Sequence, residues 1–185
     1  MAEKETKKNT AGKPAADLKS IIRTVPDFPK AGIKFYDITP ILKDGRELAY
    51  TIDTMADHFS NMNIDVVVSM EARGFLFGPA IAYKLGAGFA PVRKLGKLPW
   101  DTHQQEYALE YGTDTIEIHR DAIQTGQRVL IIDDVLATGG TAKAVTKLIG
   151  KMNGKIVGAA FVIELLTLKG RKNLGEVPVY SLLQY

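Results

Sequence analysis

Two kinds of polar group stand close together in the segment 129-VLIIDDVLATGGTAKAV-145. An apolar run leads into the adjacent carboxylates of Asp133 and Asp134, and a Thr-Gly-Gly-Thr turn, residues 138–141, begins four residues later. A turn of this composition before a helix binds anions, because unpaired backbone N–H groups and the positive end of the helix dipole meet there. Carboxylates instead accept hydrogen bonds from hydroxyl groups or hold a divalent metal through water.

One ligand satisfies both halves of this segment. A ribose would place its 5′-phosphate in the Thr/Gly turn and its 2′,3′-diol on the aspartates, with a magnesium-bound pyrophosphate on the anomeric carbon. The alternative is a simple helix cap after a strand, which explains a threonine and one glycine but not two adjacent carboxylates. The segment is neither a Walker A loop nor a dinucleotide fingerprint, since it lacks Gly-Lys-Ser/Thr and the G-x-G-x-x-G spacing.

The thirteen residues VLIIDDVLATGGT resemble the motif with which type I phosphoribosyltransferases bind 5-phosphoribosyl 1-pyrophosphate (PRPP). Further segments are similar to the adenine-specific members of that family and follow the same order: 26-PDFPKAGIKFYDITP-40, 71-EARGFLFGPAIAYKLG-86, 93-RKLGKLPW-100, 108-ALEYG-112, 164-ELLTLKGRKNL-174 and 181-SLLQY-185. The resemblance implies the type I phosphoribosyltransferase fold, with a small N-terminal hood and a flexible catalytic loop. It also implies purine salvage, in which adenine and PRPP give AMP and pyrophosphate.

The resemblance assigns PRPP binding to residues that follow three of the predicted strands: Arg73, Arg93, Lys94, Lys97, Asp133, Asp134, Ala137, Thr138, Gly139, Gly140 and Thr141. Arg73 offers a rigid fork of donors that suits pyrophosphate oxygens. The cations Arg93, Lys94 and Lys97 surround Gly96, and we interpret them as a clamp that neutralises the leaving group. The alternative for such a charge run is a solvated face.

The catalytic residues implied by the resemblance are Glu110, Arg73, Asp133 and Asp134. Glu110 lies in the returning arm of the predicted flexible loop, about residues 93–113, and is expected to act as a general acid–base at the imidazole side of adenine. A solvated loop carboxylate is the alternative. Closure of the loop would exclude water, the competing acceptor of the sugar. The expected cofactor, Mg²⁺, is held mainly by PRPP, with contacts through water to Asp133 and Asp134.

The adenine pocket is predicted in 32-GIKFYD-37, with Lys34, Phe35 and Tyr36 as its residues. An aromatic ring stacked on a base contributes about 1–3 kcal/mol, and the resemblance places Phe35 there; ordinary core packing is the alternative. The backbone C=O of Lys34 would accept from the 6-amino group and its N–H would donate to N1. Oxo-purines would leave these groups unpaired, which supports strong discrimination. Tyr36 stands where many relatives carry a basic residue.

Strand and helix patterns alternate along the chain and predict an α/β fold with a mainly parallel, twisted sheet flanked by helices. The expected strands cover residues 64–70, 88–94, 114–120, 128–133, 155–165 and 177–183, and the expected helices cover 15–22, 45–62, 75–86 and 138–150. Proline and glycine indicate loops over residues 26–40 and 95–113. We expect a single domain over residues 15–185, with the hood at about 15–42. Ligands of such sheets bind beyond the carboxyl ends of the strands.

The composition limits the classes of function. The 185 residues include no cysteine, which excludes disulfides, thiolate nucleophiles and zinc–thiolate sites. No apolar run approaches the ~20 residues of a membrane span, so we expect a cytoplasmic protein without a membrane partner. Residues 1–14 carry four lysines and two glutamates, most of the net charge of +3, and are predicted to be a disordered basic tail. Nucleic-acid binding is therefore not expected, and the three histidines have no metal-ligand spacing.

Two other functions remain open at this point. One is a phosphoribosyltransferase for another base, such as xanthine, guanine, hypoxanthine or orotate, which would keep the PRPP site. The other is a PRPP-sensing regulator that binds nucleic acid without catalysis, and it would need a folded basic face. The resemblance also implies a homodimer, because loops of this family reach across the subunit interface.

Overall fold

A computed structural model describes residues 17–108 and 112–185 of the chain. The predicted tail, residues 1–14, and the predicted catalytic residue Glu110 lie outside the described residues. The chain divides into two compact units, Met1–Thr54 and Met55–Tyr185, with the boundary inside helix α3 (Gly45–Phe59).

The first unit is built on an antiparallel pair of strands, β1 (Arg23–Pro26) and β2 (Lys34–Asp37), with Val25 opposite Phe35. The prediction that residues 26–40 form a loop without regular elements is wrong, because pairing with β1 supplies a partner that local sequence does not reveal. The helix expected over residues 15–22 is only α1 (Leu18–Ile21). Helix α2 (Thr39–Lys43) begins where Asp37 Oδ1 accepts hydrogen bonds from the backbone N–H (2.9 Å) and the hydroxyl (2.6 Å) of Thr39.

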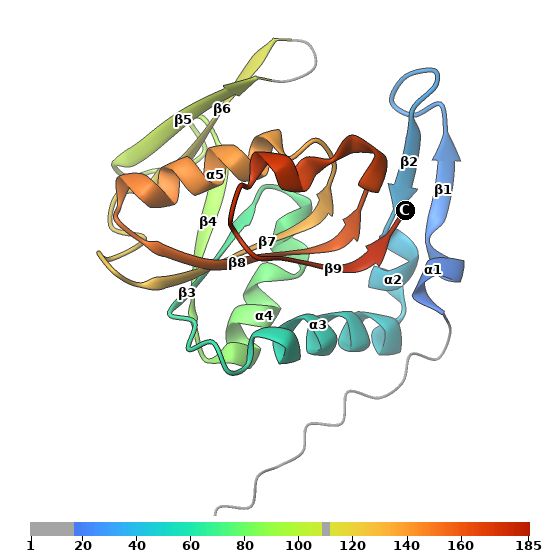
Figure 1. The fold of residues 1–185 in the computed structure, drawn as a ribbon, viewed down its shortest axis with the longest axis horizontal. Coiled ribbons are helices and arrows are strands. Elements are labelled where there is room, and N and C mark those ends of the chain that lie inside the picture. Colours follow the sequence, from blue (N-terminus) through green and yellow to red (C-terminus); the bar gives the residue numbers. More distant parts are fainter. Residues whose placement is uncertain (1–16, 109–111) are drawn as a thin grey trace, which may run out of the picture. The chain divides into compact units, whose positions relative to one another are not determined.

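A sheet of seven strands in the described residues organises the second unit, in the order β5–β6–β4–β3–β7–β8–β9 (Figure 1). Its strands are β3 (Val66–Met70), β4 (Gly88–Lys94), β5 (Thr102–Ala108), β6 (Thr113–His119), β7 (Arg128–Leu136), β8 (Lys155–Glu164) and β9 (Val179–Gln184). Strand β3 runs parallel to β4 and β7, and β8 runs parallel to β7 and β9. The antiparallel pairs within this described sheet are β4 with β6 and β5 with β6. The predicted α/β fold with a mainly parallel sheet is confirmed.

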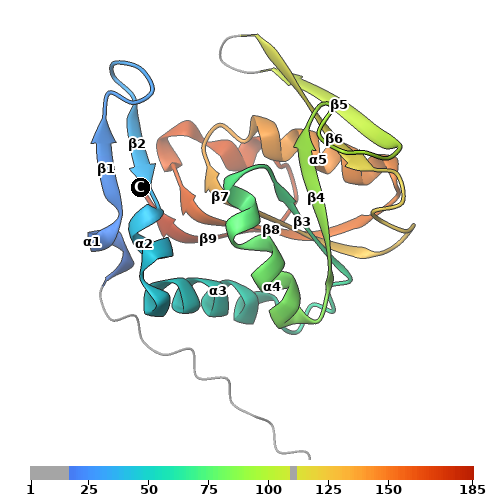
Figure 2. The ribbon, with the colours of Figure 1, turned by 180° about the vertical axis from the view of Figure 1, so that it is seen from behind.

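Helices α4 (Gly78–Leu85) and α5 (Gly140–Lys151) cover opposite faces of this sheet: α5 lies in front in Figure 1, and α4 lies in front in Figure 2, the view from behind. The sheet is the core, since β3 is buried at every position and Val129–Ile132 of β7 are inaccessible. Short 3₁₀ helices occur at η1 (Arg73–Leu76), before α4, and at η2 (Leu166–Leu168) and η3 (Gly170–Asn173), between β8 and β9. Across the described part of the chain, the helices are too short or too polar to cross a membrane.

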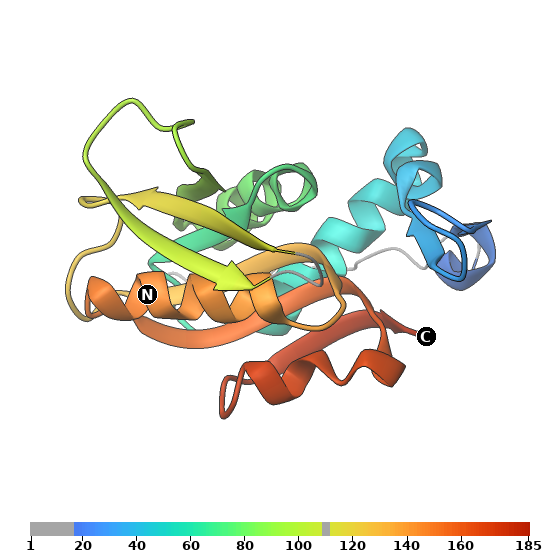
Figure 3. The ribbon, with the colours of Figure 1, turned by 90° about the horizontal axis from the view of Figure 1, so that it is seen from above.

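Two departures from the sequence predictions matter for the site. Strand β7 continues to Leu136 because β8 keeps pairing with it, so Asp133 and Asp134 lie inside the strand rather than at its end. Strand β5 occupies part of the predicted loop 95–113 and pairs with β6 from Thr102 to Ala108. Its polar side chains give no alternating apolar signal, so the sequence did not indicate it. Figure 3 shows β5 crossing over α5, where the Lys151 ammonium donates a hydrogen bond to the Gln104 carbonyl (2.5 Å).

Candidate active site

A small hollow of about 90 Å³ opens where β7 passes into α5. All five residues predicted to cradle a phosphate, Ala137 to Thr141, line it, and we call these residues the phosphate cradle. Helix α5 begins at Gly140 without a hydrogen bond from a capping side chain among the described residues. Its first backbone N–H groups and the positive end of its dipole therefore face the hollow, as an anion site requires.

Backbone packing closes the rear of the phosphate cradle. Gly139 has φ +80°, a left-handed conformation, and a Cβ added to it would clash with the carbonyl oxygen of Gly170. A Cβ on Gly170 would in turn clash with the carbonyl oxygen of Ala137. The Asn173 side-chain amide donates a hydrogen bond to the Thr138 carbonyl (2.8 Å). Residues 170–173 thus hold the cradle through close backbone contacts, which leave no room for a side chain at Gly139 or Gly170.

An ion pair fixes those supporting residues. The guanidinium of Arg171 donates to both oxygens of Glu164, with Nε–Oε1 and Nη2–Oε2 distances of 2.6 Å, and to the Val179 carbonyl (3.0 Å). Ser181 Oγ donates to Glu164 Oε2 (2.7 Å), and Glu164 is only 2% exposed. Arg171 and these hydrogen bonds lower the pKa of Glu164 against the opposing effect of burial. Glu164 and Arg171 lie in the segment 164–174, which resembles the phosphoribosyltransferases, but nothing in their spacing revealed this supporting role.

Asp133 lines the same hollow as the cradle, and Asp134 follows it in β7. The Asp134 backbone N–H donates to Asp133 Oδ1 (2.9 Å), and Arg73 Nε lies 2.9 Å from Asp134 Oδ2, an ion pair that is not aligned as a hydrogen bond. A Cβ on Gly74 would lie 2.9 Å from Asp133 Oδ1, so the turn that carries Arg73 approaches the carboxylate closely. The structure thus brings Arg73, Asp133 and Asp134 together.

Burial dominates the electrostatics of this pair. It raises the pKa of Asp133 well above its usual value, and the neighbouring Asp134 carboxylate raises it further. Burial also raises the pKa of Asp134, with the charge of Arg73 opposing the shift. Two adjacent carboxylates that resist ionisation in this way are suited to a ligand that brings hydroxyl donors or positive charge.

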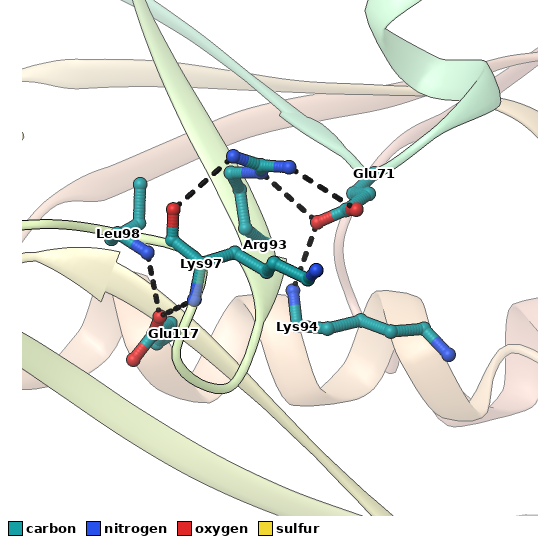
Figure 4. A network of polar contacts seen from close by, with 6 residues as sticks. All are labelled: Glu71, Arg93, Lys94, Lys97, Leu98 and Glu117. Carbon is teal, nitrogen blue, oxygen red and sulfur yellow. Dashed lines mark hydrogen bonds and ion pairs between the residues drawn. The ribbon is translucent and has the colours of Figure 1, made fainter.

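The predicted clamp lies at the end of β4 and in the turn that follows it. We call residues 94–98 the basic turn (Figure 4). Arg93 donates to Glu71 through Nε (3.0 Å) and Nη2 (3.3 Å) and to the Lys97 carbonyl through Nη1 (3.1 Å). The Lys94 ammonium lies 3.3 Å from Asp114 Oδ2. Glu71 belongs to the same turn as Arg73, so the two segments predicted to bind pyrophosphate are joined by hydrogen bonds.

A larger hollow, of about 570 Å³, adjoins the phosphate cradle. Its lining, which the sequence predictions missed apart from the cradle itself, consists of Glu106, Tyr107, Ala108, Thr138, Gly140, Thr141, Lys143, Ala144, Lys147 and Asn173. Burial raises the pKa of Tyr107, with the Thr141 hydroxyl opposing the shift. Strand β5 therefore reaches the cradle, a contact that its polar sequence did not indicate.

The residues predicted to bind adenine belong to the first unit. Lys34, Phe35 and Tyr36 are consecutive in β2, and Phe35 packs edge-on against Phe28 with ring centroids 5.1 Å apart. Phe35 is half-buried and is not part of a closed core. Pro26 is the ladder partner of Lys34, and because proline has no N–H it offers no donor to the Lys34 carbonyl.

The described residues contain no group of three or more His, Cys, Asp and Glu side chains that could hold a metal ion. Asp133 and Asp134 offer carboxylate oxygens, but two residues are too few for a complete set of metal ligands. They suit a metal that takes most of its ligands from a bound phosphate compound. His58 stacks on Tyr180 with ring centroids 4.1 Å apart, which is a packing role.

Comparisons with known proteins agree with this geometry. A family model described as "Phosphoribosyl transferase domain" matches residues 34–181. The chain is 58% identical over 177 residues to the adenine phosphoribosyltransferase of Koribacter versatilis, covering 96% of this chain and 97% of the relative. The solved adenine phosphoribosyltransferase of Thermoanaerobacter pseudethanolicus has a TM-score of 0.89 at 51% identity, covering 91% of this chain and 98% of its own. That of Saccharomyces cerevisiae, complexed with adenine and an imino-altritol bisphosphate, has a TM-score of 0.86 at 42% identity, covering 90% and 96%.

Proposed function

Because the chain belongs to the phosphoribosyltransferase family, we infer that it is an adenine phosphoribosyltransferase, the activity for which its relatives are named. It joins N9 of adenine to the anomeric carbon of PRPP. The bond from that carbon to pyrophosphate breaks, and N9 loses its proton, so that the products are AMP and pyrophosphate. The observation that carries this inference is the phosphate cradle beside two buried carboxylates and Arg73, in a chain 58% identical to its named relative.

We propose that the phosphate cradle anchors the 5′-phosphate and that Asp133 and Asp134 accept hydrogen bonds from the ribose hydroxyls. Positive charge develops on the sugar as the bond to pyrophosphate breaks, and the carboxylates stabilise it because they lie in a region of low dielectric. Arg73 is 42% exposed although its Nε lies on Asp134, so an incoming pyrophosphate can reach its guanidinium. The cationic side chains of the basic turn add to the positive charge that Arg73 offers to pyrophosphate. Positioning and electrostatics thus supply most of the rate enhancement.

We also propose Mg²⁺ as the cofactor. The pair Asp133 and Asp134 offers oxygen ligands, which suit a hard cation, but too few of them to form a cage of its own. The ion would therefore bind with PRPP, reach the aspartates through water, and supply neutralisation of the pyrophosphate charge.

For the base we propose Lys34, Phe35 and Tyr36 as contacts and Glu110 as the general acid–base. The support is the position of the first three residues in β2, where Phe35 keeps an accessible side and Lys34 faces a proline without a donor. Such backbone readout would accept the 6-amino group of adenine and reject an oxygen in its place.

A homodimer is proposed from the surface of the second unit. Large apolar side chains are exposed there on η1, α4 and the residues after β4: Leu76 (45%), Tyr83 (86%), Leu95 (54%) and Trp100 (68%). We propose that these side chains form one apolar patch, which a second copy of the chain would cover. Sedimentation equilibrium should give twice the mass of one chain, and the substitution Tyr83→Glu should shift the protein toward monomer. The cytoplasmic location expected from the sequence stays a prediction.

The activity is tested by release of pyrophosphate from PRPP and magnesium with adenine, hypoxanthine, guanine, xanthine and orotate in parallel. Turnover with adenine alone is the expected result. Turnover with an oxo-purine would keep the PRPP site and overturn the adenine pocket, whereas PRPP binding without turnover on any base would indicate a regulator.

A further inference from the structure

Glu117 is a buried carboxylate that none of the assignments above uses. It lies in the middle of β6, opposite Arg93 of β4 on one side and Gln104 of β5 on the other, and is only 3% exposed. Burying a carboxylate is costly unless hydrogen bonds replace its water. Its position therefore requires an explanation in terms of the groups that it binds.

Two donors to Glu117 belong to the basic turn (Figure 4), and a third follows it in the chain. Oε1 accepts hydrogen bonds from the backbone N–H groups of Lys97 and Leu98, each at 3.0 Å, and Oε2 accepts one from the Thr102 hydroxyl (3.2 Å). Hydrogen bonds from neutral donors to a charged acceptor are about twice as strong as neutral pairs. One side chain thus holds two consecutive backbone groups of the turn.

The other side of the basic turn is held by Arg93 and Glu71. Arg93 donates to the Lys97 carbonyl and, through two nitrogens, to Glu71, whose Oε2 also accepts from the Lys94 backbone N–H (3.2 Å). The pKa of Glu71 is lowered mainly by Arg93, and the charge of Lys97 contributes. Figure 4 shows the Lys97 side chain running toward the side of Glu71, while that of Lys94 points elsewhere.

We propose that Glu117 is a positioning residue for phosphoribosyl transfer: it fixes the backbone of the basic turn so that Lys97 is presented to the pyrophosphate group. The proposal rests on the function proposed above. Glu117 touches no substrate itself and acts through Lys97. Its effect is thus expected on substrates that carry the pyrophosphate group and not on adenine.

The strand pairing alone does not need a carboxylate at this position. Strand β6 is held by its ladders to β4 and β5 and by the buried Ile116 and Ile118 on either side of Glu117. A uniformly structural role would affect all substrates alike through the fraction of folded enzyme. A positioning role separates them, and this difference makes the proposal testable.

The test measures steady-state kinetics of the full chain in both directions, with Glu117→Ala and Glu117→Gln. We expect Glu117→Ala to raise KM for PRPP and for pyrophosphate about tenfold, the ratio that corresponds to about 1.4 kcal/mol of binding, with KM for adenine unchanged. Glu117→Gln keeps the size and one acceptor oxygen, and should restore most of the loss. If Glu117→Ala does not fold, the glutamine variant still carries the test, with a rise of about twofold expected for a weakened hydrogen bond.

Asp65→Asn is the matched control. Asp65 Oδ2 accepts a hydrogen bond from the Arg128 backbone N–H (2.7 Å) at the opposite, amino-terminal end of the parallel strands. This substitution also weakens a carboxylate-to-backbone bond, and it should change thermal stability without changing any KM.

A double-mutant cycle with Lys97→Ala decides whether Glu117 acts through Lys97. If it does, adding Glu117→Ala to Lys97→Ala causes little further rise in KM for pyrophosphate, because coupled residues are not additive. Equal increases in KM for adenine and pyrophosphate, or fully additive losses in the cycle, would overturn the proposal. A wild-type enzyme inactive with adenine would instead refute the proposed function, so the two failures are distinguishable.

Discussion

The phosphate cradle and the basic turn follow two strands, β7 and β4, whose carboxyl ends lie at one edge of the same sheet, but they are held differently. Backbone packing against residues 170–173 holds the cradle, and a Cβ at Gly139 would clash with Gly170. Carboxylates hold the basic turn from either side, and a Cβ at Gly96 would meet nothing within 4 Å.

The difference matches the chemistry proposed for each segment. A 5′-phosphate stays in place throughout the reaction, and a rigid set of N–H groups binds it at no cost in reorganisation. Pyrophosphate leaves, and the turn proposed to bind it is held by side-chain hydrogen bonds rather than by close packing, with open space beside Gly96. Packing therefore specifies the proposed anchor of the 5′-phosphate, and polar contacts specify the turn proposed to bind pyrophosphate.

The largest effect is expected from a glycine-to-alanine substitution in the phosphate cradle, compared with the same substitution in the basic turn. Gly139→Ala combines the strain of a left-handed residue with overpacking, together about 2–5 kcal/mol, and PRPP binding should be lost. Gly96→Ala also has a positive φ, +76°, but open space, and should cost only the strain, about 1–2 kcal/mol. Thermal unfolding and a PRPP titration of both variants measure this, and equal losses would remove the contrast between the segments.

The next largest effect is expected for Asp133→Asn, which should raise stability and lower activity. Folding raises the pKa of Asp133, so the ionised carboxylate penalises the folded state as pH rises through and above its ordinary value. Asp133→Asn should therefore be more stable than the wild type at neutral pH, and this gain should vanish as pH falls below about 4. Activity should fall about 10–100-fold, because a charged acceptor of the ribose hydroxyls is lost.

Unfolding curves and kcat/KM between pH 4 and 8 check this prediction. A variant less stable than the wild type at neutral pH would mean that the carboxylate is not penalised by its burial.

A smaller effect tests the support behind the cradle. Glu164→Gln replaces charge-assisted hydrogen bonds to Arg171, which should cost about 1.5–3 kcal/mol of stability. Because folding lowers the pKa of Glu164, the wild type has this advantage above the ordinary glutamate value and loses it as acid protonates the carboxylate. KM for PRPP should rise while KM for adenine stays constant. Urea unfolding at pH 7 and pH 4 gives the stability difference, and an advantage that grew toward acid would contradict the assignment.

The smallest effect is expected for one neutral hydrogen bond. Asn173→Ala removes the bond to the Thr138 carbonyl, worth about 1 kcal/mol, and should raise KM for PRPP about fivefold with kcat unchanged. The exposed Asn61→Ala serves as its control. A change in kcat alone would show that Asn173 does more than hold the cradle.

Much of the site was predictable because its signals are local. The cradle lies within five consecutive residues, and its glycines, threonines and preceding apolar run stand next to one another in the chain. The carboxyl ends of parallel strands then bring Arg73, Asp133 and the basic turn to one edge, as the alternation of strands and helices indicated. The strand β5 was not predictable, since half-exposed polar residues carry no apolar alternation.

The sequence by itself determined the fold class, the Thr-Gly-Gly-Thr turn proposed to bind phosphate and the identity of its neighbouring acids and cations, since each depends on residue type and short spacing. Only the tertiary structure decided the raised pKa of Asp133, the support from Glu164 and Asn173, and the hold of Glu117 on the basic turn. These depend on burial and on contacts between residues far apart in the chain, such as Thr138 and Asn173, which are 35 positions apart. Local spacing cannot specify such contacts, because they form only when separate strands pack into one sheet.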